Sequence, residues 1–243
     1  MSQLHDTGER MIPTAEGEVS FVFARHRFAY EWARQFVAGK DVLDIGCGTG
    51  YGCKILSESA SSVLGIDYSA EAIEFCRKKF SASNIEYVQM DASQFKLNRQ
   101  FDVAVSFQVI EHLQHPDTFL DRIKDVMRPS GKIIITTPNV RVPTAESNTN
   151  PFHFNEMNYQ QFYRLLQSKL DTFDLYGIGY ASPNRLRRVV QSFPLYRQVG
   201  KLFKRANPVK KIAGTAMNMT SFTVLTSDVA RDAIDLLAIC VNE

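Results

Sequence analysis

A glycine-rich turn that follows an apolar run is the strongest chemical signal in the sequence. Residues 42–50 read Val-Leu-Asp-Ile-Gly-Cys-Gly-Thr-Gly, so a predicted strand leads directly into the spacing GxGxG. Glycine has no Cβ and adopts positive φ readily, so the backbone of such a turn lets a bound nucleoside approach closely. Because glycine clusters also form ordinary turns, a nucleoside site is predicted here only together with acidic residues nearby.

Three aspartates lie at or near the ends of successive predicted strands. Asp44 belongs to the first strand, and Asp67, which is 17 positions after Gly50, ends the second and is placed to accept hydrogen bonds from ribose hydroxyls. Asp91 ends the third strand and is placed to accept a hydrogen bond from the exocyclic amine of adenine. Any one of them alone is better explained as a helix cap. Their occurrence together favours one shared nucleoside site.

The elements that must position these residues alternate between short apolar runs and helical stretches. Strands buried on both faces and separated by helices indicate βαβ units and a parallel sheet. We therefore predict an α/β fold: a Rossmann-like, doubly wound, mostly parallel sheet with N-terminal helices and an inserted helical cap. The predicted strands are Val42–Ile45, Val63–Ile66, Ile85–Gln89, Val103–Phe107, Lys132–Thr136, Thr172–Gly179 and Leu236–Val241, and the predicted helices are Glu18–Phe36, Ser69–Phe80 and Met157–Leu170.

The charges are distributed unevenly along the 243 residues. The formal net charge is +2, but the stretch between Leu175 and Ser227 holds nine basic residues and no acidic one, which leaves a body of −7. We predict three parts: an N-terminal helical lid at 1–39, a core at 40–179 and 228–243, and a basic amphipathic cap at 180–227. If Leu236–Val241 is a strand, the cap is inserted just before the final edge of the sheet.

The basic cap admits several interpretations. Residues 185–211 would contact an anionic membrane surface beside a lipid-linked acceptor, or would bind a phosphorylated or nucleotide-linked acceptor over the active site. A solvated pair of helices covering the sheet edge explains the pattern without a ligand. A nucleic-acid surface ranks last, because no RNA-binding module accompanies the basic residues.

Targeting and metal-binding signals are not found in the sequence. No apolar run approaches the roughly 20 residues that cross a bilayer, and the first residues do not resemble a secretory signal. The four cysteines form no CxxC pair of the kind that binds metals. We expect a cytoplasmic protein with reduced cysteines, which would contact a membrane only peripherally and through the cap. We predict no metal ligands.

At this point the sequence resembles the class I S-adenosylmethionine-dependent methyltransferases. The matching blocks occur in the order and spacing of that family and cover roughly residues 40–180. Within the family, the Glu-His-Leu and Thr-Pro-Asn blocks are most similar to the branch that O-methylates small molecules, quinones and glycans. The blocks are VLDIGCGTG at 42–50, VLGIDYS at 63–69, MDAS at 90–93, FDVAVSFQVIEHL at 101–113 and RPSGKIIITTPN at 128–139.

The resemblance implies S-adenosyl-L-methionine as cofactor and S-adenosyl-L-homocysteine as product. The glycine loop would lie against the methionine portion, Asp67 would hold the ribose, and Asp91 and Ala92 would hold the adenine. An NAD-linked oxidoreductase is disfavoured, because the spacing is GxGxG rather than GxGxxG. The cofactor-binding residues implied are Asp44, Gly46, Cys47, Gly48, Gly50, Asp67, Tyr68, Asp91, Ala92, Phe107 and Gln108.

Transfer of a methyl group to a hydroxyl requires removal of the hydroxyl proton, so a base is expected near the acceptor. Glu111 and His112 follow the fourth predicted strand, and His153 lies after the fifth with Glu156 three residues later. His153 is the favoured base, with a packing or capping role as the alternative. His112 and Glu111 are further catalytic candidates, although the family resemblance also suits a role in shaping the cofactor loop.

Arg27 and Tyr30, one helical turn apart, are predicted to belong to the lid and to contact the substrate or cofactor. A surface helix with an aromatic core face explains them as well. The expected activity is O-methylation of a small hydroxylated acceptor of sugar, natural-product or lipid-linked type. The alternatives are N-methylation, methylation of RNA or protein, and a non-catalytic subunit that binds the cofactor and regulates a partner.

Overall fold

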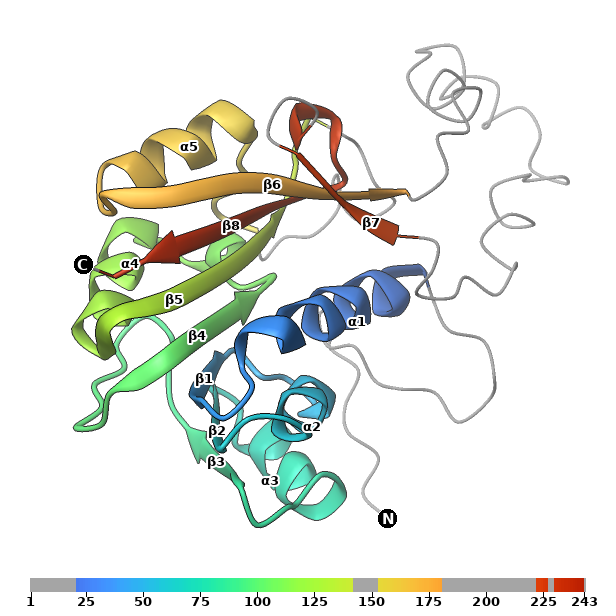
Figure 1. Cartoon of the computed structure of the whole chain (residues 1–243), viewed down its shortest axis with the longest axis vertical. Helices are drawn as coiled ribbons and strands as arrows, with labels where there is room; N and C mark the ends of the chain where they lie inside the picture. Colours follow the sequence, from blue (N-terminus) through green and yellow to red (C-terminus); the bar gives the residue numbers. More distant parts are fainter. Residues whose placement is uncertain (1–20, 142–152, 181–221, 227–229, 243) are drawn as a thin grey trace, which may run out of the picture.

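The computed structural model describes residues 21–141, 153–180, 222–226 and 230–242. Its centre is an eight-stranded sheet of order β3-β2-β1-β4-β5-β8-β6-β7 (Figure 1). The pairs from β3 to β5 are parallel, and β8 pairs antiparallel with both β5 and β6. The strands are β1 Asp41–Ile45, β2 Ser62–Asp67, β3 Ile85–Gln89, β4 Phe101–Phe107, β5 Met127–Pro138, β6 Thr172–Tyr180, β7 Phe222–Leu225 and β8 Asp235–Val241.

Two of the helices, α3 and α5, begin at side-chain caps. Ser69 caps α3 by accepting a hydrogen bond from the Ala72 amide. Asn158 and Gln161 form a reciprocal capping box at the start of α5. The α-helices are α1 Phe21–Ala33, α2 Tyr51–Ser57, α3 Ala70–Lys79, α4 Pro116–Asp125 and α5 Tyr159–Gln167, and the short 3₁₀ helices are η1 Arg34–Phe36, η2 Ile110–His112 and η4 Ala230–Asp232.

Successive residues of each central strand enter two different cores, because side chains alternate across a sheet. Val42 and Val63 belong to the core beneath α1, α2 and α3. Leu43 and Leu64 belong to the core beneath α4 and α5. Figure 1 shows helices on both sides of the sheet, and the predicted doubly wound, mostly parallel architecture is confirmed.

The far edge of the sheet differs from the prediction. The run at Leu236–Val241 does form a strand, but β8 lies between β5 and β6 and is not the final edge. The edge is β7, whose four residues lie inside the range predicted as cap and pair with β6. Residues 222–225 therefore extend the sheet. A strand of four residues is too short to give a clear periodicity in the sequence. Residues 181–221 of the predicted cap lie outside the described residues.

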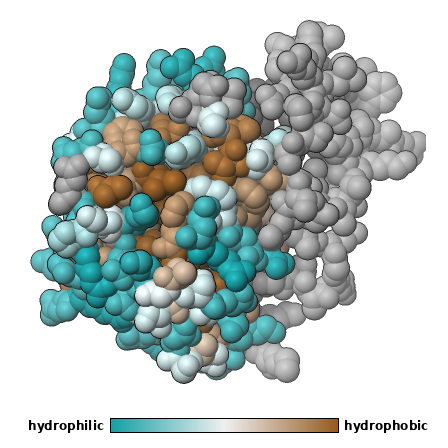
Figure 2. All heavy atoms as spheres, viewed as in Figure 1, coloured by the Kyte–Doolittle hydropathy of each residue, from teal (hydrophilic) through white to brown (hydrophobic). Residues whose placement is uncertain are grey.

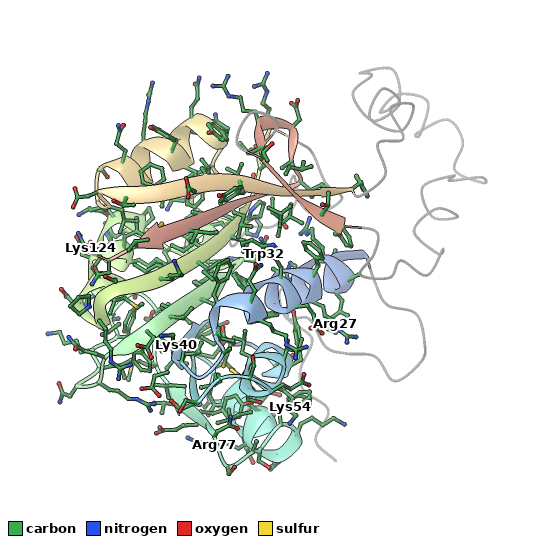
Figure 3. The ribbon with its side chains drawn as sticks, viewed as in Figure 1. Arg27, Trp32, Lys40, Lys54, Arg77 and Lys124 are labelled. Carbon is green, nitrogen blue, oxygen red and sulfur yellow. The ribbon has the colours of Figure 1, made fainter. Side chains whose placement is uncertain are left out.

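The surface outside the sheet is mostly hydrophilic. Figure 2 shows hydrophobic side chains gathered over the central strands, between the hydrophilic side chains of the helices. On α1, Trp32 is half-buried against the core beneath α1, α2 and α3, whereas Arg27 is exposed and points away from the strands (Figure 3). Within the described part of the chain, no helix combines the length and apolar character needed to span a membrane.

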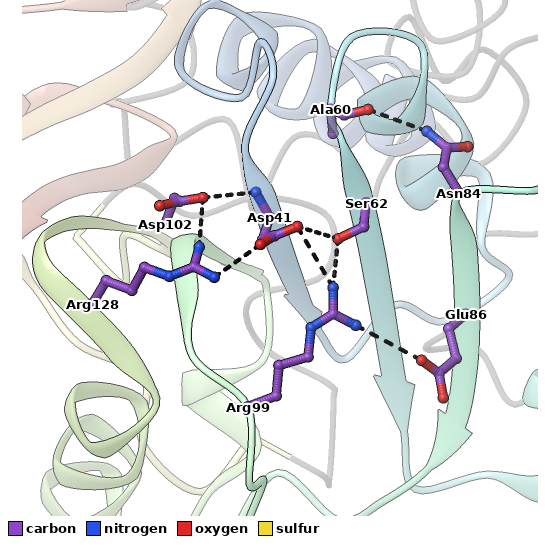
Figure 4. A network of polar contacts seen from close by, with 8 residues as sticks. All are labelled: Asp41, Ala60, Ser62, Asn84, Glu86, Arg99, Asp102 and Arg128. Atoms are coloured by element: carbon purple, nitrogen blue, oxygen red, sulfur yellow. Dashed lines mark hydrogen bonds and ion pairs between the residues drawn. The ribbon is translucent and has the colours of Figure 1, made fainter.

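The amino ends of the strands are joined by a polar network at the edge opposite the glycine loop (Figure 4). The Arg128 guanidinium lies 2.9 Å from the Asp41 carboxylate of β1 and 2.8 Å from the Asp102 carboxylate of β4. The Ser62 hydroxyl of β2 donates to Asp41 at 2.6 Å, and the Asp41 amide donates to Asp102 at 2.8 Å. These groups hold neighbouring strands in register and leave the carboxyl edge free for chemistry.

Candidate active site

The glycine loop, Gly46–Gly50, joins β1 to α2 in a backbone conformation that requires glycine. Gly46, Gly48 and Gly50 all have positive φ, at 75°, 53° and 79°. A Cβ on Gly46 would lie 2.4 Å from a methyl of Val109, so this glycine brings the loop against the residues that follow β4. A Cβ on Gly48 would meet nothing within 4 Å, so its missing side chain leaves an open approach to the backbone. This is the geometry expected where a ligand passes close to the loop.

Asp67, at the carboxyl end of β2, is bonded directly to the glycine loop. Its carboxylate accepts hydrogen bonds from the Gly48 amide at 3.0 Å and from the Ser69 amide at 2.9 Å. The side chain of Tyr68, the next residue, is 62% exposed. Asp91 is also exposed, and its carboxylate accepts from the Ser93 amide at 2.7 Å. Both aspartates therefore cap local turns, and a carboxylate oxygen can accept more than one hydrogen bond.

Asp44 is fully buried beneath the glycine loop, where it accepts two hydrogen bonds. The Tyr30 hydroxyl donates to one carboxylate oxygen at 3.1 Å, and the Cys53 thiol donates to the other at 3.1 Å. Burial, with a smaller contribution from the Asp67 charge, raises the pKa of Asp44 to about 7, although the two hydrogen bonds lower it. Both carboxylate oxygens of Asp44 thus have partners within the protein, and its contact with a cofactor stays a prediction.

Tyr30 and Arg27, predicted as lid residues, lie on different sides of α1. Tyr30 is 4% exposed and packs edge-on against Phe107, with ring centroids 4.7 Å apart. Arg27 is exposed and its guanidinium lies 3.5 Å from the Glu31 carboxylate. The Arg27 charge acts on Tyr51, the residue after the glycine loop, and offsets part of the rise in the pKa of Tyr51 that burial causes. Contact of Arg27 or Tyr30 with a substrate stays a prediction.

The remaining predicted cofactor residues surround the glycine loop at the ends of the strands. Gln108 follows β4 with a φ of 57°, and its side-chain amide donates to the Thr136 hydroxyl at 3.1 Å. Cys47 is 3% exposed, so it can contact a ligand only through its backbone. Ala92 is half-buried against the core beneath α4 and α5. Their contacts with a cofactor stay predictions.

A second group of side chains, which we call the histidine cluster, consists of Glu111, His112, His153 and Glu156. One potential ligand atom from each of Glu111, His112 and His153 lies within 4.8 Å of the others. The two imidazole rings meet edge-on with centroids 4.7 Å apart. Nδ1 of His153 lies 2.8 Å from the Glu156 carboxylate, which is the orienting contact predicted from the sequence.

Backbone hydrogen bonds hold the two segments of the histidine cluster together. The amides of Phe154 and Asn155 both donate to the Glu111 carbonyl, each at 2.9 Å. The Asn155 side-chain amide donates to the Leu113 carbonyl. The loop that carries His153 is therefore fastened to η2, which carries Glu111 and His112. Sequence reasoning treated these residues separately and missed that they meet.

Glu111 is the buried member of the histidine cluster. It is 1% exposed, and one of its carboxylate oxygens accepts a hydrogen bond from the Thr137 hydroxyl at 3.2 Å. Burial raises the pKa of Glu111 to about 8, and the nearby Asp235 charge also raises it. Arg25 and Asp235 form an ion pair at 3.1 Å behind the cluster, with side chains 1% and 2% exposed.

Sequence reasoning missed the pair of Arg25 and Asp235. A signal for Arg25 was present, because Arg25 stands at positions i, i+4 and i+8 with Ala29 and Ala33, and all three are buried on the inner face of α1. A cation on an apolar helix face indicates a buried anionic partner. No comparable signal marked Asp235, which begins a strand.

The residues present fit S-adenosylmethionine. The open approach over Gly48, the carboxylate of Asp67 beside it, and the exposed side chain of Tyr68 provide a backbone contact, a ribose acceptor and an aromatic surface. Val109 contacts Gly46 and lies two residues before Glu111, so the glycine loop and the histidine cluster adjoin.

Known proteins support this interpretation. Residues 43–135 match the family of methyltransferase domains. A protein of Mycolicibacterium smegmatis named as an S-adenosylmethionine-dependent methyltransferase is 35% identical over 170 residues, which are 69% of this chain and 65% of that relative. The mitochondrial ubiquinone biosynthesis O-methyltransferase of Schizosaccharomyces pombe is 31% identical over 109 residues, which are 43% of this chain and 40% of that relative.

The solved structure of an S-adenosylmethionine-dependent methyltransferase from Thermotoga maritima has the same fold, with a TM-score of 0.61 at 13% identity. It matches over 91% of this chain and 93% of that chain. The chain spans 58–65% of the length of the first curated relatives that it matches. Through residues 43–135 the chain belongs to the class I S-adenosylmethionine-dependent methyltransferases, whose cofactor is S-adenosylmethionine.

Proposed function

We propose that the protein transfers the methyl group of S-adenosylmethionine to a hydroxyl group of a small acceptor. The glycine loop and Asp67 hold the cofactor, and the histidine cluster receives the acceptor. The observation that carries this proposal is the contact of Gly46 with Val109, which brings the cofactor loop against the segment that carries Glu111 and His112. A donor and an acceptor bound at these two places would be neighbours.

When bound, the cofactor supplies a methyl group that its sulfonium already activates. The chain's own tasks are therefore to align the two reactants and to prepare the oxygen, and alignment alone can contribute about 7–11 kcal/mol. In the reaction an oxygen–carbon bond forms as a carbon–sulfur bond breaks, the electron pair of the broken bond stays on sulfur, and the hydroxyl proton leaves. We assign activation of the hydroxyl to His153, because Glu156 fixes its orientation and its side chain retains 9% exposure.

The choice of a hydroxyl acceptor is supported by chemistry and by one relative. A carboxylate or a neutral amine needs no proton removal before it attacks, so a fixed imidazole at the acceptor position favours a hydroxyl. The similar protein of Schizosaccharomyces pombe is named for O-methylation in ubiquinone biosynthesis. Sugar, natural-product and lipid-linked hydroxyls all remain in the proposed class. The basic residues proposed to contact a lipid-linked acceptor, 185–211, lie outside the described residues.

The test is a screen with radiolabelled S-adenosylmethionine against lipid, glycan and small-molecule fractions of an extract. We expect label in a product that mild base does not cleave, as befits an ether rather than a methyl ester. Stabilisation of the chain by S-adenosylhomocysteine against heat should accompany it. Stabilisation without label in any fraction would contradict turnover and favour a cofactor-binding subunit. Label found only in an amine, an RNA or a protein would contradict the hydroxyl acceptor.

A further inference from the structure

The histidine cluster has the donor set of a metal site. Two imidazoles and one carboxylate are the protein ligands of many catalytic zinc ions and of other first-row metals, whereas Mg²⁺ and Ca²⁺ prefer oxygen. Metal–ligand bonds of about 2.0–2.2 Å place tetrahedral ligand atoms about 3.4 Å apart. The corresponding atoms of Glu111, His112 and His153 lie within 4.8 Å of one another, so rotation of the side chains would close the site.

The contacts around these three residues resemble those that orient metal ligands. Nδ1 of His153 lies 2.8 Å from the Glu156 carboxylate, which leaves Nε2 as the coordinating nitrogen. A carboxylate on the far nitrogen is a common partner of a metal-bound histidine, since it fixes the ring and its tautomer. Thr137 holds the carboxylate of Glu111 from the other side at 3.2 Å. Each of these two ligands therefore has an orienting partner that does not depend on substrate.

The backbone also holds the donors together before any ligand binds. Glu111 and His112 are consecutive in η2, and two amide hydrogen bonds of 2.9 Å fasten the loop of His153 to the Glu111 carbonyl. A bound ion would therefore have to adjust the donor side chains but would not have to bring the two backbone segments together.

We infer that Glu111, His112 and His153 bind one divalent first-row transition-metal ion, of the kind represented by Zn²⁺, Co²⁺ and Mn²⁺. Three protein ligands leave at least one coordination position open. If the proposed function holds, His153 activates the acceptor as a ligand of this ion and not as a base. The hydroxyl oxygen occupies the open position, where the ion lowers the pKa of the hydroxyl and its proton passes to solvent water. The binding of the ion does not rest on the proposed function, whereas this role does.

The decisive experiment measures metal binding by the full chain, without cofactor or acceptor. After removal of metals with a chelator, Co²⁺ is added and the visible d–d absorption is recorded. We expect one equivalent to bind and Zn²⁺ to displace it. His112→Ala and His153→Ala should each weaken binding at least tenfold, and Glu156→Gln should weaken it about 10–100-fold. His115→Ala is the matched control, because this exposed histidine begins α4 outside the cluster.

Circular dichroism of each variant shows whether it is folded. Absence of Co²⁺ binding by the folded wild-type chain, or equal binding by His112→Ala, His153→Ala and wild type, would overturn the site. A second arm measures label transfer in the presence of chelator, and a loss of at least tenfold that added Zn²⁺ or Mn²⁺ restores is expected. If the chain binds Co²⁺ but transfers the methyl label equally well in the presence of chelator, the proposed role of the ion in activating the hydroxyl is wrong, although the metal site itself stands. Co²⁺ binding without transfer to any acceptor would contradict the proposed function alone.

Discussion

The glycine loop and the histidine cluster lie beside each other at the same sheet edge, but the chain builds them differently. The glycine loop is five consecutive residues, and its amides bond to the end of the neighbouring strand β2, through the Ile66 carbonyl and the Asp67 carboxylate. The histidine cluster joins η2 to a loop some 40 residues later, through the bonds of Phe154 and Asn155 to Glu111. The backbone that would meet the cofactor therefore comes from one contiguous segment with three positive-φ glycines, whereas the histidine cluster exists only where two distant segments meet.

Removal of the His153 side chain should produce the largest effect. In His153→Ala the proposed activating group is lost, and turnover should fall by about 10²–10⁴-fold. The affinity for S-adenosylhomocysteine should stay within twofold, because the glycine loop is untouched. Initial rates of label transfer and calorimetric titrations measure the two quantities. His115→Ala is the control, and a His153→Ala variant with full turnover would contradict the assignment.

The second largest effect should come from the buried pair behind the histidine cluster. In Arg25→Met the carboxylate of Asp235 loses its partner at 3.1 Å, and both side chains are almost fully buried. Loss of one member of such a pair costs about 3–5 kcal/mol of unfolding free energy. Arg27→Met, on the exposed face of the same helix, should change stability little. Urea unfolding compares the two variants, and equal losses would show that the burial of Arg25 is not the cause.

The difference between the two sites also explains what sequence could predict. Seven of the strands were predicted within a few residues, because each buried run is bounded by polar residues. The glycine loop and Asp67 were found together since their spacing is short and chemically restrictive. The meeting of His112 with His153 was not predicted, because a pairing across 41 positions leaves no local pattern. The place of β8 inside the sheet was missed for the same reason.

The support beneath the glycine loop should make stability depend on pH. The pKa of Asp44 is raised from 3.8 to about 7 by burial, so the native state holds this proton more tightly than the unfolded chain does. The stabilisation is complete below about pH 4 and is lost as the pH rises toward 7, at up to about 1.4 kcal/mol per pH unit. The groups that face Asp44 are Tyr30, Cys53 and Asp67.

Asp44→Asn removes this ionisation and retains most of the shape of the side chain. The difference in unfolding free energy between wild type and Asp44→Asn should therefore shift in favour of the variant between pH 4 and pH 7. Urea unfolding at a series of pH values measures it. Parallel curves for the two proteins would show that Asp44 is charged throughout this range.

Asp67 and Asp91, which both cap turns at the carboxyl edge of the sheet, should differ in how much they contribute to cofactor affinity. Asp67→Asn removes the charged acceptor proposed for the ribose, and hydrogen bonds to charged groups contribute about 1.5–3 kcal/mol. The dissociation constant for S-adenosylhomocysteine should rise about 10–100-fold. Asp91→Asn, at an exposed turn with the same kind of cap, should have a smaller effect. Calorimetric titration measures both, and a larger effect at Asp91 would contradict the assignment of the ribose to Asp67.

The smallest effect on stability is expected from substitution of Gly48, and this substitution tests the cofactor site most directly. Gly39 provides a matched control. Gly48 and Gly39 have φ of 53° and 68°, and a Cβ at either position would meet nothing within 4 Å. Gly48→Ala and Gly39→Ala should therefore each cost about 1–2 kcal/mol from the left-handed backbone alone. Only Gly48→Ala should also lose binding of S-adenosylhomocysteine, because only there does the new methyl group stand in the proposed path of the ligand. Thermal melts with and without S-adenosylhomocysteine separate the two effects. Equal stabilisation of both variants by the ligand would mean that the cofactor does not lie in the open space at Gly48. The assignment of the cofactor to the glycine loop would then lose its main evidence, whereas the evidence for the histidine cluster would be unaffected.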